Sequence, residues 1–203
     1  QPLVVVLRPN NNDLEASVPN RPIFSTLQRL EDAGVRHIEL AWSAHPGWIS
    51  LIKEIQSKFK GRLLLGAASI SSSEALESIA KLGLSYAMSP LWNPTLQNQA
   101  KSLQQVLIPG VFSPTEIQQA SLLGCRLIKL FPASTLGIKY LTQIKEPIGT
   151  LPFVIAAGGL SVSDLNPWLE AGFGAIVLGK ELFKDGQLDP LLTKWLTNQS
   201  RTT

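Results

Sequence analysis

Eight short apolar runs recur along this 203-residue chain, and their spacing restricts its fold more than any other feature. Each run is bounded by Gly, Pro, Ser or Asn, and the gaps between runs suit one buried strand plus one crossover helix. Continuous apolar runs of this length are typical of parallel strands covered on both faces. The runs lie at residues 3–7, 37–40, 63–67, 86–88, 106–108, 127–130, 153–156 and 175–178.

The stretches between these runs carry the spacing and boundary signals of helices. Ile23, Leu27 and Leu30 share one helical face, for example, and residues 113–116 resemble a capping box with proline in the first turn. Three of the predicted helices begin at a serine cap, and all four end at a glycine. The four clearest helices are predicted over residues 23–34, 72–83, 113–124 and 161–172.

Eight strand–helix units predict a single-domain (β/α)8 TIM barrel over residues 1–203, at the lower size limit of that fold. The alternative is a doubly wound open sheet, which usually carries a glycine-rich fingerprint after its first strand. Here the first run leads into Arg8-Pro9-Asn10-Asn11-Asn12 instead. We therefore favour the barrel, with the polar connection 10–22 as a loop at its mouth.

Composition excludes several classes of protein. With 44% hydrophobic and 16% charged residues the chain can bury a large core, but it has no apolar stretch of membrane-span length. Cys125 is the single cysteine, so an intrachain disulfide is excluded, and two histidines leave little for a metal site. The net charge of +3 is spread without a cluster, which favours anionic small molecules over nucleic acid. No leader pattern is recognisable, so we expect a cytoplasmic protein, although a first residue of Gln1 leaves the native start open.

Lys129 is the first candidate for chemistry because it interrupts a run that is otherwise apolar on both faces of a strand. Burial disfavours the charged form of an amine, and a neutral amine can condense with a carbonyl group as a Schiff base. Two alternatives stay open: Lys129 pairs with a buried carboxylate for structural reasons, or it extends along the outside of its strand.

Glu39 is the second candidate, and it shares one face of the second run with His37. The other face carries Ile38 and Leu40, which suit packing against helices. Glu39 is therefore predicted to face the barrel interior, as a proton-transfer group beside Lys129 or as its structural ion-pair partner. His37 is predicted to be a core residue, because no metal-ligand spacing accompanies it.

Glycines follow the last two runs, where barrels of this kind often build a phosphate site from backbone N–H groups. Gly158 and Gly159 follow the seventh run and Gly179 follows the eighth, although glycines also simply make turns. Lys180 comes next, where its ammonium group would either join a phosphate site or extend into solvent.

Taken together, these residues resemble the pyruvate-dependent class I aldolases that act on 2-keto-3-deoxy-6-phosphogluconate and 4-hydroxy-2-oxoglutarate. The matching stretches follow the family's order along nearly the whole chain, and Ile-Pro-Gly-Val and Lys-Leu-Phe-Pro-Ala are the most specific of them. They lie at residues 5–8, 34–39, 65–69, 87–90, 108–116, 128–133 and 157–161.

The resemblance implies that Lys129 is the Schiff-base lysine and that Glu39 is the general acid/base. It also implies a small 2-keto acid substrate, no metal or organic cofactor, and a cytoplasmic homotrimer. The remaining implied roles are packing against pyruvate by Pro90 and Phe131, a position near the substrate for Ser69 in place of the family's threonine, and phosphate-binding amides at Gly158, Gly159 and Gly179.

The chain departs from the family pattern where the family holds the substrate carboxylate. Ala41-Trp42-Ser43 stands where Thr-x-Arg or Thr-x-Thr is usual, and Ser43 carries no charge. Arg8, at the end of the first run, is the best remaining candidate to bind this carboxylate. The alternative is that Arg8 pairs with Glu39 and only tunes its pKa.

The sequence thus predicts a class I aldolase that cleaves a 2-keto acid, phosphorylated or not, to pyruvate and an aldehyde. One alternative is a phosphate-binding barrel enzyme without a Schiff base, similar to thiamine phosphate synthases or isomerases. The other is a non-catalytic barrel that binds a sugar acid. An interior lysine favours the aldolase, because neither alternative needs one.

Overall fold

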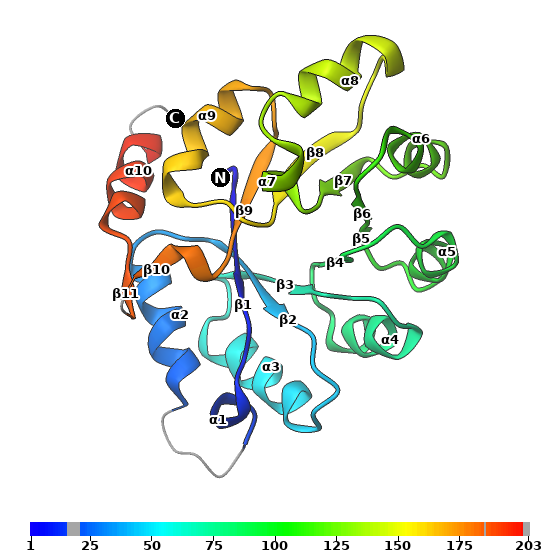
Figure 1. Cartoon of the computed structure of the whole chain (residues 1–203). Helices are drawn as coiled ribbons and strands as arrows, with labels where there is room; N and C mark the ends of the chain where they lie inside the picture. Colours follow the sequence, from blue (N-terminus) through cyan, green and yellow to red (C-terminus); the bar gives the residue numbers. More distant parts are fainter. Residues whose placement is uncertain (16–20, 185, 201–203) are drawn as a thin grey trace.

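The computed structural model describes residues 1–15, 21–184 and 186–200, and its main sheet has nine parallel strands in the order β5-β4-β3-β2-β1-β9-β8-β7-β6. The first and last strands of this order are two halves of one segment, separated by Pro109, so the sheet closes into an eight-stranded barrel (Figure 1). The predicted barrel is confirmed, and the open sheet is excluded. The strands are β1 (Leu3–Leu7), β2 (His37–Ala41), β3 (Leu64–Ala68), β4 (Tyr86–Met88), β5 (Leu107–Ile108), β6 (Gly110–Val111), β7 (Leu127–Leu130), β8 (Phe153–Ala157) and β9 (Ala175–Leu178).

Helices connect the strands and surround the barrel (Figure 1). The capping box at Ser113 and Glu116 is present, and Gly83 ends its helix in the left-handed region. The connection predicted as a loop contains a short helix, and its residues 16–20 lie outside the described part of the chain. The helices are α1 (Asn11–Leu14), α2 (Pro22–Asp32), α3 (Gly47–Lys58), α4 (Ser73–Leu82), α5 (Pro94–Ser102), α6 (Pro114–Leu122), α7 (Ala133–Leu136), α8 (Tyr140–Ile148), α9 (Leu165–Glu170, after a 3-10 turn at Val162–Asp164) and α10 (Pro190–Ser200), with a 3-10 turn at Lys180–Leu182 and a hairpin of β10 (Phe183–Lys184) and β11 (Gln187–Leu188) before α10.

Side-chain alternation divides the core into two parts. Outward-facing strand residues such as Val5, Ile38 and Ile128 are buried against the helices. Inward-facing residues form a smaller cluster inside the barrel, and Val4 belongs to it with Val6 packed alongside. The predicted packing of Ile38 and Leu40 against the helices is therefore confirmed. The buried members of the inner cluster are Val4, Tyr86, Met88, Ile108, Ile155, Ala157, Ala175 and Val177.

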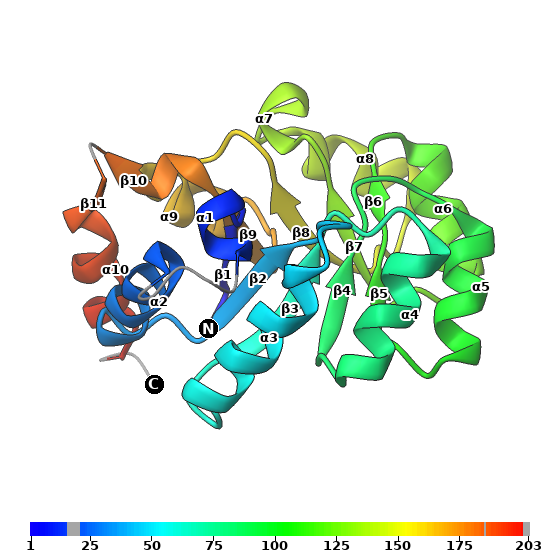
Figure 2. The same ribbon diagram turned by 90° about the horizontal axis from the view of Figure 1, so that it is seen from below.

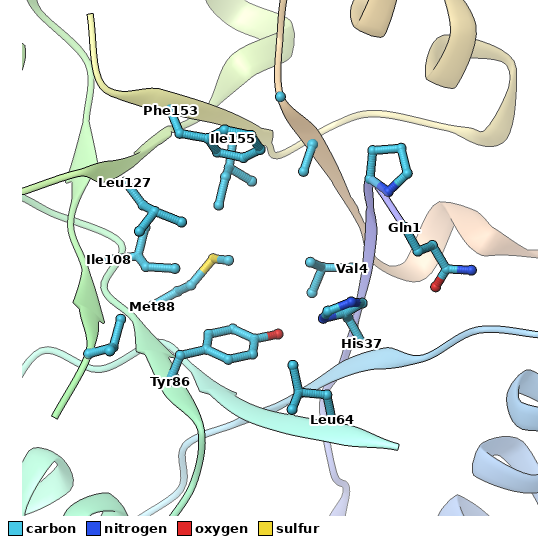
Figure 3. A pocket seen from close by; sticks show the side chains of 14 residues that line it. Gln1, Val4, His37, Leu64, Tyr86, Met88, Ile108, Leu127, Phe153 and Ile155 are labelled. Carbon is cyan, nitrogen blue, oxygen red and sulfur yellow. The ribbon is translucent and has the colours of Figure 1, made fainter. Parts of the chain in front are cut away.

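Pockets lie at opposite ends of the barrel. Where the strands begin, mainly apolar side chains line a space of about 500 Å³, which we call the N-terminal hollow (Figure 3). Figure 2 shows α7 projecting at one end of the barrel, directly after β7. No helix in the described ranges is long and apolar enough to cross a membrane.

Candidate active site

A second space, of about 560 Å³, lies where the strands end, and we call it the C-terminal pocket. Barrel enzymes carry their active sites on this face, because the loops that follow the strands meet there. Every residue that the sequence analysis assigned to the site lines this pocket. These residues are Arg8, Glu39, Ser69, Pro90, Lys129, Phe131, Gly158, Gly159, Gly179 and Lys180.

Lys129 enters the pocket from β7. Its neighbours Ile128 and Leu130 are buried on the helix-facing side, so alternation turns Lys129 inward, where it is only 7% exposed. Its Nζ atom lies 5.1 Å from the ring centre of Phe131. Burial lowers the pKa of the amine below its ordinary value, and the charge of Glu39 opposes this shift. The outside position is thus excluded, and the neutral, nucleophilic form is favoured more than in a surface lysine.

Glu39 lines the same pocket from β2, in register with Val6 on one side and Gly66 on the other. Its side chain is 1% exposed, and burial raises the pKa of the carboxyl group, against the opposing charge of Lys129. Within the described residues the two groups form no salt bridge, and Oε1 of Glu39 has no hydrogen-bond partner. The structural ion pair is therefore not formed, and both groups line the pocket from separate strands.

The loops after β8 and β9 bring backbone to the pocket surface. Gly158 and Gly159 have φ values of 96° and 74°, in the region that favours glycine, and a Cβ atom at Gly159 would collide with the Ser134 side chain. The N–H groups of Gly158, Gly159 and Gly179 donate to no acceptor among the residues described. Free N–H groups beside a pocket are the elements of an anion site.

Comparison with known proteins identifies the family. The profile of the KDPG and KHG aldolase family matches residues 16–190. The chain belongs to this family. It is 27% identical over 156 residues to the 2-dehydro-3-deoxy-6-phosphogalactonate aldolase of Escherichia coli strain K12, a match that covers 77% of this chain and 76% of that enzyme. The chain is therefore an aldolase, in the lyase class of enzymes, and neither alternative function is supported.

Solved structures share the barrel over nearly the full chain. A native KDPGal structure matches with a TM-score of 0.81 and 22% identity, covering 100% of this aldolase and 97% of that chain. The KDPG aldolase of Legionella pneumophila, with pyruvate captured as a covalent carbinolamine intermediate, matches with a TM-score of 0.76 and 18% identity over 97% and 93% of the two chains. Because both sequence identities are below 25%, these structural matches establish the shared fold.

Two cationic residues lie at the rim of the aldolase pocket. Arg8 is exposed and forms no salt bridge within the described ranges, so the predicted alternative of an Arg8–Glu39 pair is wrong. Lys180 is also exposed, and its Nζ atom lies 3.8 Å from Oε1 of Glu181. Both cations are thus available to an anionic ligand.

The segment that departs from the family pattern lies away from the pocket lining. Ser43 accepts a hydrogen bond from the backbone N–H of His45, at 3.2 Å, and does not line the C-terminal pocket. Ser69, which does line it, has a φ of 65°. This is an uncommon conformation for a residue with a side chain, and such strain is concentrated at functional sites.

Some lining residues were missed by the sequence analysis. Leu160, Glu181 and Phe183 come from the loops after β8 and β9, where no periodic pattern marks a contact with the pocket. Tyr86, inside the barrel, was assigned only to a strand. No group of three or more His, Cys, Asp or Glu side chains in the described structure could hold a metal ion.

Proposed function

We propose that this chain cleaves a 2-keto acid to pyruvate and an aldehyde through a Schiff base on Lys129. The observation that carries the proposal is the pair of buried groups, Lys129 and Glu39, that line one pocket without forming an ion pair. Further support comes from the Legionella relative, in which pyruvate forms a carbinolamine. The substrate class is a 2-keto-3-deoxy-6-phospho sugar acid or 4-hydroxy-2-oxoglutarate, in line with the names of the family and its relatives.

In this mechanism the neutral amine of Lys129 attacks C2 of the keto acid, and loss of water gives an iminium ion. The C3–C4 bond then breaks: its electron pair moves toward the iminium nitrogen, and the C4 hydroxyl loses a proton as the aldehyde forms. Protonation of the enamine at C3 and hydrolysis release pyruvate and restore the amine. Glu39 takes up and returns the protons, because its carboxyl group is held close by and its raised pKa suits transfer near neutral pH.

The other pocket residues bind the substrate in this proposal. Pro90 and Phe131 pack against the pyruvate part, and Ser69 donates a hydrogen bond to it. The free N–H groups after β8 and β9 hold a phosphate group. No step requires a metal or an organic cofactor.

We also propose that the protein is a cytoplasmic homotrimer, as its family resemblance implies. Leu91 and Phe112 support self-association, because they are 43% and 44% exposed on segments that directly follow the pocket residue Pro90 and strand β6. Large apolar side chains in neighbouring exposed positions are typical of interfaces.

The test is aldol cleavage by the purified protein, followed as pyruvate release. Three substrates separate the classes: the 6-phosphogluconate-derived keto acid, its galactonate epimer and unphosphorylated 4-hydroxy-2-oxoglutarate. Pyruvate release from at least one of them supports the proposal. Release from none, with folded protein, contradicts it.

Lys180→Ala is expected to raise KM about 10-fold for a phosphorylated substrate, because one charge-assisted contact to the phosphate is lost. KM for 4-hydroxy-2-oxoglutarate should stay the same. Lys139→Ala, in a lysine outside the pocket lining, is the matched control. If KM changes equally for both substrates, Lys180 does not bind the phosphate group.

Arg8→Lys keeps the charge but loses the planar fork that holds a carboxylate by two hydrogen bonds. We expect KM for pyruvate, measured by exchange of its C3 hydrogens with solvent, to rise about 10-fold with a smaller change in kcat. If Arg8→Ala leaves KM unchanged, the carboxylate is held by backbone amides and hydroxyl groups instead.

A further inference from the structure

Tyr86 lies in the same row of the barrel as Glu39. In the strand register Glu39 of β2 pairs with Gly66 of β3, and Gly66 pairs with Tyr86 of β4. The Tyr86 ring lies across Gly66, because a Cβ atom built there would come within 2.5 Å of the ring carbon that carries the hydroxyl group. The glycine therefore lets the phenol of β4 extend over β3 toward β2.

The outer end of the phenol is enclosed. Figure 3 shows the Tyr86 hydroxyl pointing away from β4, toward Val4 and His37 of the first two strands. Tyr86 is 9% exposed, and its hydroxyl oxygen is buried without a hydrogen-bond partner among the residues described. The phenol thus forms part of the wall between the N-terminal hollow, which it lines, and Glu39 in the C-terminal pocket.

Two unpaired polar atoms therefore lie inside the barrel, on residues of one row of the strand register: the Tyr86 hydroxyl and Oε1 of Glu39. Burial raises the pKa of the phenol, and the charge of Glu39 raises it further, so the two groups interact electrostatically. Buried polar groups are rarely left unpaired, because an unmade hydrogen bond destabilises the fold. One donor and one acceptor in the same enclosed region can satisfy each other.

We propose that Tyr86 is a positioning residue of this aldolase: its hydroxyl group donates a hydrogen bond to Oε1 of Glu39 through one bound water molecule. This bond holds the carboxyl group from the side of the N-terminal hollow. The second carboxyl oxygen is left for proton transfer in the C-terminal pocket. The inference rests on the proposed function of Glu39 for its effect on catalysis, but not for the hydrogen bond itself.

A donor to the carboxylate favours its charged form and so opposes the effect of burial on its pKa. Removing the hydroxyl group should therefore raise the pKa of Glu39 further, while the phenol itself stays neutral near pH 7. The other titratable or charged groups around the carboxyl group are Lys129 from β7, His37 from β2, Arg8 from the end of β1, and the rim pair Lys180 and Glu181 after β9.

Tyr86→Phe removes one oxygen atom and leaves the ring, and Tyr140→Phe is the matched control. Tyr140 is the other tyrosine of the chain, and its hydroxyl donates to the carbonyl of Phe112, outside the pocket lining. The first measurement titrates the glutamate carboxyl groups by 13C NMR. In Tyr86→Phe we expect the one carboxyl group with a raised pKa to titrate about one pH unit higher, with no change in Tyr140→Phe.

The second measurement is the pH profile of pyruvate C3–H exchange. The acid limb in Tyr86→Phe should move up by the same amount, with kcat lowered and KM for pyruvate unchanged. If the carboxyl pKa in Tyr86→Phe equals that of the wild type, the proposed hydrogen bond is refuted, whether or not the protein is active. A shifted titration in a protein that exchanges no pyruvate hydrogens supports the bond and contradicts only the proposed function.

Discussion

Borohydride reduction in the presence of pyruvate is expected to attach a pyruvate-derived group to Lys129 and to leave Lys129→Met unmodified. Methionine keeps the length and apolar stem of the side chain, so it fills the same space in the barrel. Loss of the nucleophile should lower cleavage of the keto acid about 10⁴–10⁶-fold, because no other group of the site can form the covalent intermediate. Peptide mass spectrometry of the reduced protein locates the adduct.

Lys139→Met is the control for this experiment and should be labelled as strongly as the wild type. An adduct at Lys180 or Lys139 in the wild-type protein would refute the assignment. The rate of trapping should also rise with pH as the amine loses its proton. Since burial lowers the pKa of Lys129, this rise should end below the ordinary lysine range.

Glu39→Gln is expected to lower both keto-acid cleavage and pyruvate C3–H exchange about 10²–10⁴-fold, the usual contribution of general acid/base catalysis. The amide has the size of the carboxyl group but cannot accept and return a proton. KM for pyruvate should change much less, because the amine and the carboxylate-binding groups remain. Steady-state assays and deuterium exchange into pyruvate measure these effects.

The pH dependence gives a second test of Glu39. Burial raises its pKa, so the carboxyl group keeps its proton to higher pH than an ordinary glutamic acid, and the acid limb of wild-type exchange should lie above the ordinary range. This limb should disappear in Glu39→Gln. Glu170→Gln makes the same change in an exposed side chain outside the pocket lining and should keep it. An unchanged exchange rate in Glu39→Gln would leave Glu39 with a structural role only.

The sequence allowed the barrel and the two main catalytic candidates to be predicted, because both depend on local periodicity. Lys129 was a candidate because it interrupts an apolar run, and the structure settles its direction: Ile128 and Leu130 face the helices and Lys129 lines the pocket. Strand alternation predicted that Glu39 faces the interior, and the structure confirms it. Caps such as Ser113 were recognisable because the residues that form them are three or four positions apart.

Features that depend on residues distant in the sequence could not be predicted in this way. The contact of Tyr86 with Gly66 joins two strands, and nothing local in either strand indicates it. The left-handed conformation of Ser69 is likewise set by its surroundings, since serine has no preference for it. Whether Arg8 pairs with Glu39 could not be predicted either, because alternation gives the direction of a side chain at a strand end but does not identify its neighbours.

The interrupted fifth strand has a consequence for the nucleophile. Its first half, β5, pairs only with β4, and its second half, β6, pairs only with β7, so the hydrogen-bonded ring has a seam at Pro109. Lys129 is anchored at this seam, because its backbone N–H donates to the carbonyl of Pro109 at 2.8 Å. The strand that carries the reactive amine is therefore attached beside the interruption of the barrel wall. A shift of the chain at Pro109 would thus move the backbone that carries the reactive amine.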